Sequence, residues 1–437
     1  AGVTPSKQMG QNILIDPNMA RWIVRQLDLS PEDAVVEVGP GTGALSEHLL
    51  GAVRQLVLIE FDARLAEALT TRYAGRQDVV VYHADAARFD IRQLFKLRPV
   101  KFLGNLPYSS GGAILKNLLS HPHPFSRAVV MLQKEVIERL AAAPRDDAYG
   151  ILSLRTQVAW HVDVLRTVPP EAFYPRPSID SAVAILHPRI DGLPSFDRRL
   201  FDELVRRGFA QRRKQLAKQM PQTRTWSEIA EQLEIPATSR AEELSLEQWV
   251  ELTRAYDDHR LKDLPQSADE LFDVVDAEDQ PVSVATRSEV HQAKHLHRAV
   301  HVFVFNPRGE LLIQQRSMLK DEHPGVWGSS VSGHLNAGES YHEAAQRELE
   351  EEMGIISDEA PKEILQLAAN EQTGMEHLRV FRITYHGKIR FPASEVQSAI
   401  WMPICELIAW MNSQPDDFSP GFSLCFKAAF ANSSATS

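Results

Sequence analysis

The sequence predicts an α/β protein built from two separate globular units. In the first 190 residues, short apolar runs alternate with helical patterns, as in a parallel sheet whose strands are joined by crossover helices. Charge also divides the chain: residues 1–260 carry 33 basic and 32 acidic side chains, whereas residues 261–437 carry 14 and 26. A near-neutral part joined to a strongly acidic part favours two independently folded units.

Length and composition set the broad class. A chain of 437 residues holds two or three domains, and its 43% hydrophobic and 24% charged residues are ordinary globular values. No apolar run approaches 18 residues, so no membrane span is predicted, and the first residues lack the apolar core of a secretory signal. Cys405 and Cys425 have no zinc or redox spacing, and a cytoplasmic location is expected.

The elements of the first unit follow from its apolar runs and helical periodicity. Strands are predicted at 34–38, 55–59, 79–82, 101–103 and 128–132, with a late strand at 182–186 added to the same sheet. Helices are predicted between them at 19–27, 46–50 and 65–72. This order predicts a parallel sheet covered by helices, over residues 1–190.

The pattern changes twice beyond that sheet. Residues 191–258 are predicted to form a small α-helical lobe, and the polar, proline-containing stretch 259–270 is predicted to be a linker. Residues 271–437 form the last predicted unit. Its strands are expected at 271–275, 300–305, 310–315, 378–385 and 399–402, around a helix at 340–353. That arrangement predicts an α/β/α sandwich.

A glycine-rich turn follows the first predicted strand of the sheet, in the stretch VVEVGPGTGALSEHLL. Gly39, Gly41 and Gly43 let the backbone approach a ligand closely, and the start of a helix follows. Glu60 ends the next predicted strand, where an acidic residue can bind ribose hydroxyls. The pattern also fits dinucleotide binding, so by itself it leaves the ligand open.

The segment Asn105-Leu106-Pro107-Tyr108 follows the strand KFLG and narrows the choice. The Asn105 side-chain oxygen and the Leu106 carbonyl can both accept hydrogen bonds from an exocyclic amine, which would turn the amine lone pair towards an electrophilic methyl group. Tyr108 offers a face on which a base can stack. The alternative is an ordinary turn, in which asparagine and proline are common.

Several separated motifs accompany this segment in one order. They are QNILIDPNMA near the N-terminus, Asp85, LQKEVIERL, AYGILSL, FYPRPSIDSAV and AQRRKQLAKQ. Together they resemble the ribosomal RNA adenine dimethyltransferase family over residues 5–258. The resemblance departs at Ser109, where the family usually has another asparagine, and at Ser178, where a lysine is common. A relative that binds RNA without methylating it stays an alternative.

The resemblance implies a Rossmann-like methyltransferase that uses S-adenosylmethionine to form N6,N6-dimethyladenine at adjacent adenines of a small-subunit rRNA hairpin loop. Its cofactor residues map onto Asn12, Leu14, Gly39 and Gly41 for the pocket and methionine end, Glu60 for the ribose and Asp85 for the adenine amine. Asn105 and Leu106, in the motif with Pro107, would bind the target N6. Tyr108 and Phe173 would sandwich the flipped base.

The helical lobe carries a cluster of basic side chains: Arg206, Arg207, Arg212, Arg213, Lys214 and Lys218. Taken alone, such a cluster is better explained by a solvated helix face. The resemblance to an RNA-modifying family favours an RNA-facing patch, because cations there would neutralise backbone phosphates.

The stretch GHLNAGESYHEAAQRELEEEMGI, from Gly333 to Ile355, concentrates carboxylates on one predicted helix. Glu348 and Glu352 are spaced i,i+4, and Glu351 lies three residues after Glu348, so the side chains share a face. Like charges so close call for a cation, and oxygen ligands suit Mg²⁺ or Mn²⁺. Gly354 should end the helix. The alternative is a solvated acidic helix.

These positions resemble the Nudix box without a gap, which implies a metal-dependent hydrolase of a small diphosphate substrate. In that family the metal is held by glutamates that match Glu348, Glu351 and Glu352, and Arg347 would brace them. Glu351 therefore counts among the catalytic residues. A general base is also needed, and Glu376 and Glu395 are the candidates.

The surrounding sequence is similar to the Nudix branch that contains isopentenyl diphosphate isomerase. His291, His297 and His334 match its histidines and are kept as candidate ligands. Ser332 stands where the isomerase has a catalytic cysteine, and Gly374 replaces one of its two glutamates. Hydrolysis is therefore expected rather than isomerisation. Two further functions compete with this interpretation of the chain: a nucleotide sensor that does not cleave its ligand, and a dinucleotide-dependent oxidoreductase.

Overall fold

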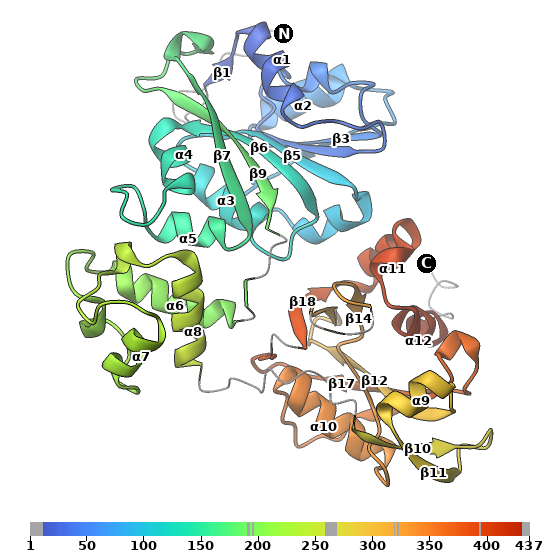
Figure 1. Cartoon of the computed structure of the whole chain (residues 1–437). Coiled ribbons are helices and arrows are strands. Elements are labelled where there is room, and N and C mark those ends of the chain that lie inside the picture. The colour runs from blue at the N-terminus through green and yellow to red at the C-terminus, as the bar shows by residue number, and fades with distance from the viewer. Residues whose placement is uncertain are drawn as a thin grey trace. The chain divides into compact units, whose positions relative to one another are not determined.

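The computed structural model describes residues 12–189, 193–194, 196–257, 269–318, 320, 323–392 and 395–430. The chain forms two compact units that divide between Tyr256 and Asp257, except that residues 195–197 group with the second unit (Figure 1). Each unit is described by itself. Most of the predicted linker, 259–270, lies outside the described residues.

The first unit is built on a seven-stranded sheet in the order β4-β3-β2-β5-β6-β9-β7. Strands β2 to β6 are parallel, and β9 is antiparallel to both of its neighbours. A short ribbon, β1–β8, lies outside the sheet. The strands are β1 Ile13–Leu14, β2 Ala34–Val38, β3 Gln55–Glu60, β4 Val79–His83, β5 Val100–Asn105, β6 Phe125–Gln133, β7 Trp160–Val168, β8 Phe173–Tyr174 and β9 Ser181–Pro188.

Helices cover both faces of this sheet, as the sequence predicts. They are α1 Pro17–Arg25, α2 Ala63–Arg72, α3 Gly111–Leu119, α4 Lys134–Ala141 and α5 Ile151–Gln157. Adjacent residues of β2 point to opposite faces: Val35 packs in the core with α1 and α2, and Val36 packs in the core with α3 and α4. A strand buried on both faces reads as a continuous apolar run, which is why β2 is apparent in the sequence.

The strand order reverses between β2 and β5. From β2 the chain moves outwards through β3 and β4, and it then returns to β5 and β6 on the other side. In such sheets a crevice opens at the carboxyl ends of the two central strands. Gly39 follows β2 with a φ of 68°, and a Cβ atom there would lie 3.2 Å from the Asn105 carbonyl oxygen at the end of β5. Glycine allows this close approach.

The prediction for this unit differs from the structure at two elements. The predicted helix at 46–50 is only a 3₁₀ turn, Ser46–His48, anchored to the sheet by the Ser46 hydroxyl, which donates to Glu37. Strand β7 was not predicted. Its central residues are exposed on both faces, so it lacks the alternation that marks a half-buried strand.

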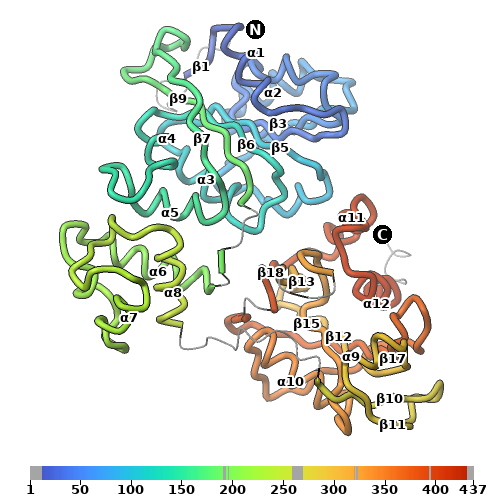
Figure 2. The backbone as a smooth tube through the Cα atoms, viewed as in Figure 1, coloured from blue at the N-terminus to red at the C-terminus, as the bar shows by residue number. Residues whose placement is uncertain are grey.

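The helical lobe belongs to the first compact unit. Its backbone is the yellow-green part of the tube in Figure 2. Its helices are α6 Arg198–Phe209, α7 Trp226–Gln232 and α8 Leu246–Tyr256. The first ends at Phe209, just beyond Gly208, whose position is packed directly against Trp249. The Tyr149 hydroxyl donates to the Leu244 carbonyl at 3.0 Å, which ties the lobe to the sheet.

The second unit has a mixed seven-stranded sheet in which β14-β13-β12-β17-β16 are neighbours, β15 pairs with β12 and β18 pairs with β13. A separate hairpin, β10–β11, precedes it. The strands are β10 Leu271–Val275, β11 Pro281–Thr286, β12 His297–Phe305, β13 Leu311–Arg316, β14 Trp327–Gly328, β15 Val331–His334, β16 Lys362–Leu367, β17 Glu376–Thr384 and β18 Val396–Met402. The helices are α9 Arg287–Ala293, α10 Tyr341–Met353, α11 Ile404–Ser413 and α12 Pro420–Phe430.

Strand β12 separates the two layers of helices, so the predicted α/β/α sandwich is confirmed. Val300 and Val302 pack with α10 on one face. Phe303 points to the other face, where its ring centroid lies 6.1 Å from that of Phe422 on α12. Helix α10 begins after a capping box at Ser340 and ends at Gly354, which has a φ of 60°, as predicted. Among the helices that the structure describes, none is long and apolar enough to cross a membrane.

Candidate functional sites

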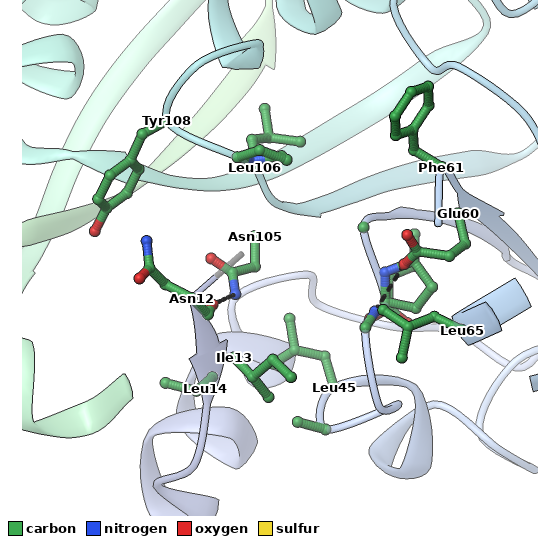
Figure 3. Close-up of a pocket in the computed structure, with 16 residues that line it drawn as sticks. Asn12, Ile13, Leu14, Leu45, Glu60, Phe61, Leu65, Asn105, Leu106 and Tyr108 are labelled. Carbon is green, nitrogen blue, oxygen red and sulfur yellow. Dashed lines mark hydrogen bonds between the residues drawn. The ribbon is translucent and has the colours of Figure 1, made fainter. Parts of the chain in front are cut away.

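A cavity opens at the carboxyl edge of the first sheet, at the reversal of strand order (Figure 3). Figure 3 shows Asn12, Asn105 and Tyr108 on one side of it and Glu60 and Phe61 on the other. The residues that line it are Asn12, Ile13, Leu14, Glu37, Gly39, Pro40, Gly41, Ala44, Leu45, Glu60, Phe61, Leu65, Asn105, Leu106, Pro107 and Tyr108. The structure therefore brings the predicted glycine turn and the Asn105–Tyr108 segment to one place.

The Asn105 amide is oriented by a backbone contact. Its Nδ2 donates to the Asn12 carbonyl oxygen at 3.2 Å, which leaves the side-chain oxygen to accept from a ligand. The Leu106 amide donates to the Met131 carbonyl at 3.1 Å and fixes the loop on β6. A Cβ atom at Gly104 would lie 2.6 Å from the Leu106 side chain, so glycine is needed for the turn to close.

Glu60 is buried and lies on the opposite side of the cavity from Asn105. Its two oxygens accept from the Gly41 amide at 3.1 Å and the Asp62 amide at 2.9 Å. Burial raises the pKa of Glu60, and the two amide hydrogen bonds oppose that effect. Each oxygen keeps a second lone pair, so the carboxylate can still accept from hydroxyl groups. This geometry suits the predicted ribose contact.

Glu37 also lines the cavity and was not predicted. It lies on β2, and its carboxylate accepts from the Ser46 hydroxyl at 2.6 Å. Burial raises its pKa to about 7, with a smaller contribution from the negative charge of Glu60. The signal in the sequence was an acidic residue inside the apolar run AVVEV, where a charge is rarely buried without a role.

We expect Glu37→Gln to stabilise the ligand-free protein at alkaline pH. A folded-state pKa of about 7, raised from 4.5, means that ionised Glu37 lowers the free energy of unfolding. This cost is absent below pH 4.5, grows up to pH 7 and is complete above it. The variant should therefore gain up to about 3 kcal/mol at pH 8 and little at pH 5 in urea unfolding. Equal effects at both pH values would contradict this, and Glu47→Gln, at an exposed position, is the control.

The remaining predicted residues of this site fall in different places. Tyr108 lines the cavity, and its hydroxyl lies 2.6 Å from Ser181 Oγ. Asp85 follows β4 and accepts from the Ala87 amide at 2.9 Å, but it is not among the lining residues. Phe173 is only 3% exposed, packs in the core with α1 and is not among the lining residues. Its stacking role stays a prediction.

The predicted basic patch divides into two groups. Arg206 and Arg207 pair with Asp202 and Glu203 of their own helix. Arg212 forms an ion pair with Glu242 and donates to the Asp146 carbonyl at 3.0 Å, which fastens the lobe, and its side chain is 37% exposed. The other three side chains are exposed and make no ion pair within the described part of the chain: Arg213, Lys214 and Lys218.

In the second unit, α10 directs the side chains of Glu348 and Glu352 towards β15. Glu352 accepts from the Ser332 amide at 3.2 Å and from Gln314 Nε2 at 3.0 Å. A Cβ atom at Gly333 would lie 2.0 Å from Glu348 Oε1, so the glycine makes room for this carboxylate. A site shaped around two buried carboxylates has the oxygen donors that a hard divalent cation requires. Glu351 lies beside them with its side chain 59% exposed.

Arg347 braces this cluster, as the resemblance implied. Its guanidinium donates to both oxygens of Glu339 at 2.8 and 2.9 Å, to Glu348 at 2.7 Å and to Glu351 at 3.0 Å. It also donates to the His334 carbonyl at 3.0 Å. Despite this cation, burial and the neighbouring Glu352 raise the pKa of Glu348 to about 8. The single positive charge of Arg347 does not balance the negative charges of the carboxylates around it.

Lys320 was missed by sequence reasoning and is buried next to these carboxylates. Its ammonium pairs with Glu395, one of the two predicted general bases. Burial lowers the pKa of Lys320, and the charges of Glu352 and Glu348 oppose that effect. Lysine is rarely buried unless its charge is matched. No local pattern in the sequence indicates that Lys320 lies beside the carboxylates of the box.

Glu376, the other predicted base, lies on the opposite face of the sheet. His291, His297 and His334 gather around it, with ligand atoms of the three histidines within 4.8 Å of one another. His334 Nε2 lies 2.9 Å from Glu376 Oε1. Burial acts to raise the pKa of Glu376, but the neighbouring imidazoles of His297 and His334 outweigh it and hold the pKa well below its usual range. Burial lowers the pKa of His334, and the hydrogen bond to Glu376 opposes that effect. Such a donor set suits a transition metal.

The two units have the architecture of a Rossmann-like methyltransferase with a helical lobe and of a Nudix sandwich. The family model for ribosomal RNA adenine dimethylase matches residues 4–258, and the model for the NUDIX domain matches residues 295–422. The chain therefore belongs to the ribosomal RNA adenine dimethylase family and carries a Nudix domain after the family's own region.

Individual relatives cover the first of these regions. The chain is 35% identical to ribosomal RNA small subunit methyltransferase A of Picosynechococcus sp., over 60% of this chain and 99% of that protein. It is 39% identical to the protein of that name from Syntrophotalea carbinolica, over 58% and 98%.

Solved structures were also matched, at low similarity. A dimethyladenosine transferase from Plasmodium falciparum has a TM-score of 0.48 and 24% identity, covering 56% of this chain and 97% of that chain. A MutT protein from Methanosarcina mazei has a TM-score of 0.27 and 20% identity, covering 32% and 94%.

Proposed function

We propose that the first unit uses S-adenosylmethionine to dimethylate N6 of adjacent adenines in a hairpin loop of small-subunit rRNA. The observation that supports this most is the joint placement of the glycine turn, Glu60 and Asn105–Tyr108 around one cavity. The family membership supports an rRNA substrate. The cofactor would supply an electrophilic methyl group on its sulfonium.

The chain's own residues would bind and orient the reactants. Glu60 would accept from the ribose hydroxyls of the cofactor, and Gly39 and Gly41 would let the backbone approach its methionine end. The Asn105 side-chain oxygen and the Leu106 carbonyl would accept the two N6 hydrogens, so that the nitrogen lone pair points at the methyl group. Tyr108 would stack on the base after it leaves the RNA stack.

The competing proposal is an RNA-binding module that does not methylate. Incubating the full chain with radiolabelled S-adenosylmethionine and small-subunit RNA distinguishes the two. Incorporation of four methyl groups at two adenines supports the first proposal. Saturable RNA binding without incorporation, under conditions where the cofactor binds, would favour the second.

For the second unit we propose metal-dependent hydrolysis of a small diphosphate compound. Glu348 and Glu352, with Glu351 at the rim, would hold Mg²⁺ or Mn²⁺, and Arg347 would keep them in place. The cation would supply charge that polarises the phosphoryl oxygens. Lys320 adds a cation to the same region, and Glu395 is the better placed base because Glu376 faces the other side of the sheet. Phosphate release from a panel of diphosphates tests this, and a nucleotide sensor would bind a compound of the panel without cleaving it.

We expect the exposed cations of the lobe to contribute to RNA affinity. Neutralising Arg213, Lys214 and Lys218 together to glutamine should weaken binding and reduce the slope of log affinity against log salt by about 2, at roughly 0.7 per phosphate contact to single strands. Filter binding from 50 to 200 mM salt measures this. An unchanged slope would refute the RNA-facing role. Arg212→Gln should instead lower the thermal unfolding midpoint, because it removes the tie to Glu242.

A further inference from the structure

Glu37 is a buried carboxyl group on the wall of the first cavity, and the proposed methyl transfer leaves it without a role. It lies on β2, it is 1% exposed, and it is among the residues that line the cavity. Fully buried carboxylates are almost always paired with a cation. An unpaired one at the wall of a cavity is therefore a candidate for contact with a charged ligand.

No cation balances Glu37 among the residues that the structure describes. Its one side-chain partner there is Ser46, whose hydroxyl donates to the carboxylate at 2.6 Å. Its neighbours in the sheet, Leu58 of β3 and Leu103 of β5, carry no charge. Helix α1, which packs on the same face of β2, buries only apolar side chains: Met19, Ala20, Ile23 and Val24.

The ionisable groups around Glu37 are negative, neutral or already matched. Glu60, at the end of β3, acts on Glu37 with a negative charge. Tyr73 follows α2 and is buried, which raises the pKa of its hydroxyl and keeps it neutral. The guanidinium of Arg72, in the last turn of α2, is paired with Glu47. A carboxylate at position 37 therefore has no positive charge near it to offset its burial.

Two carboxyl groups that share one cavity do not ionise equally, because each negative charge disfavours the other. Glu60 accepts from the Gly41 and Asp62 amides at 3.1 and 2.9 Å, which stabilises its charged form. The carboxylate of Asp62 is itself matched by Arg64. Glu37 has only a hydroxyl donor among the described residues, so it is the group that takes up a proton in the ligand-free protein. Burial raises the pKa of Glu37 to about 7.

We propose that Glu37 releases a proton when the cationic cofactor enters the cavity, and that its carboxylate then serves as the counter-charge of the cofactor. This inference rests on the proposed use of S-adenosylmethionine, and it names the residue that makes cofactor binding depend on pH. The cofactor carries a sulfonium and an ammonium group, and either would stabilise an ionised carboxylate in a site of low dielectric. The proton passes to the solvent, and no bond of the cofactor changes.

Cofactor affinity should therefore rise between pH 6 and pH 7. Protein in which Glu37 is protonated has to lose that proton before the counter-charge exists. With a pKa of about 7, the protonated fraction falls from about 0.9 at pH 6 to about 0.5 at pH 7. The Kd for S-adenosylmethionine should consequently fall about fivefold over this interval. The amino group of the cofactor stays largely charged below pH 7, so its own titration contributes little.

Calorimetric titration of the full chain in phosphate and in imidazole counts the protons released per ligand bound, because the two buffers differ in their ionisation enthalpy. S-adenosylmethionine should release about 0.9 proton at pH 6 and about 0.5 at pH 7. S-adenosylhomocysteine keeps the ammonium group without the sulfonium, and 5′-methylthioadenosine has neither. Release with S-adenosylmethionine alone assigns the sulfonium as the partner of Glu37, and release with both amino-acid ligands assigns the ammonium. Equal release with 5′-methylthioadenosine would overturn the proposal, because that ligand is uncharged.

Two variants assign the proton to Glu37. Glu37→Gln should abolish the release and hold the Kd constant within about twofold between pH 6 and pH 7. Ser46→Ala keeps the carboxyl group but removes the hydrogen bond that favours its ionised form. More Glu37 is then protonated at pH 7, so the number of protons released there should increase. Ser46→Ala keeps the test decisive if Glu37→Gln no longer binds the cofactor.

His83→Gln is the matched control, because histidine side chains ordinarily titrate in this pH range. His83 is exposed, and its Nε2 lies 3.2 Å from the carbonyl oxygen of the lining residue Phe61. Its substitution should leave the proton release unchanged. The proposal is wrong if the unsubstituted protein binds S-adenosylmethionine without releasing a proton, or if the release survives in Glu37→Gln. Absence of S-adenosylmethionine binding in both buffers would instead remove the proposed function.

Discussion

Asn105→Ala should reduce methyl transfer to RNA by at least about a hundredfold, because it removes one of two acceptors that orient the target amine. The cofactor should still bind within a few-fold, since Glu60 and the glycine turn lie on the other side of the cavity. The expected change is therefore in kcat, measured with radiolabelled cofactor at saturating RNA.

The neighbouring Ser109→Ala is the control for Asn105→Ala. Ser109 is exposed, follows the same motif and has no assigned role in chemistry. It should retain methyl transfer within about threefold, as surface substitutions usually do. If Asn105→Ala kept most of the activity, or lost cofactor binding in proportion to activity, the amine-orienting role would be wrong.

Glu352→Gln should reduce diphosphate hydrolysis by about a thousandfold, because it removes a negative charge that a divalent cation needs. The bound cation contributes several kcal/mol of transition-state stabilisation. Gln314 and the Ser332 amide can still hydrogen-bond the amide that replaces the carboxylate, so the fold should survive. Methyl transfer should be unchanged in the same preparation, which provides an internal check of folding.

Glu350→Gln is the matched control on the same helix. Glu350 is exposed and lies off the face that carries Glu348 and Glu352. Its substitution should leave hydrolysis within about threefold. Retained hydrolysis in Glu352→Gln, once a substrate of the panel has been found, would refute the metal-binding role. A titration with Mg²⁺ separates weaker metal binding from loss of the chemical step.

The order of the two units and most of their central strands could be predicted from local pattern. Strands β2 and β3 are buried on both faces, so their apolar runs are continuous and unmistakable. Helix α10 carries its own start and stop signals at Ser340 and Gly354. Strand β7 could not be predicted in this way, because its stability comes from pairing with β9 and its side chains are mostly exposed.

The residues of the candidate sites show the same division between what a local pattern predicts and what depends on tertiary contacts. Residues within one contiguous motif, such as Asn105–Tyr108 or Glu348–Glu352, were predicted together because their spacing already determines which side chains meet. Lys320 was missed because its role depends on a pairing with Glu395, 75 positions away in the sequence. The ion pair of Arg212 with Glu242 could not be predicted either, because the two residues are 30 positions apart in the sequence.

By itself, the sequence determined the two fold classes, the family and the motifs that carry the chemistry, because each of these depends on short-range spacing. Only the tertiary structure decided which residues are usable. It raised the pKa of Glu37 by burial, gathered three histidines from α9, β12 and β15 beside Glu376, and placed Phe173 in the core. Burial, partner and direction are set by contacts between segments distant in the chain, and a local pattern contains no information about them.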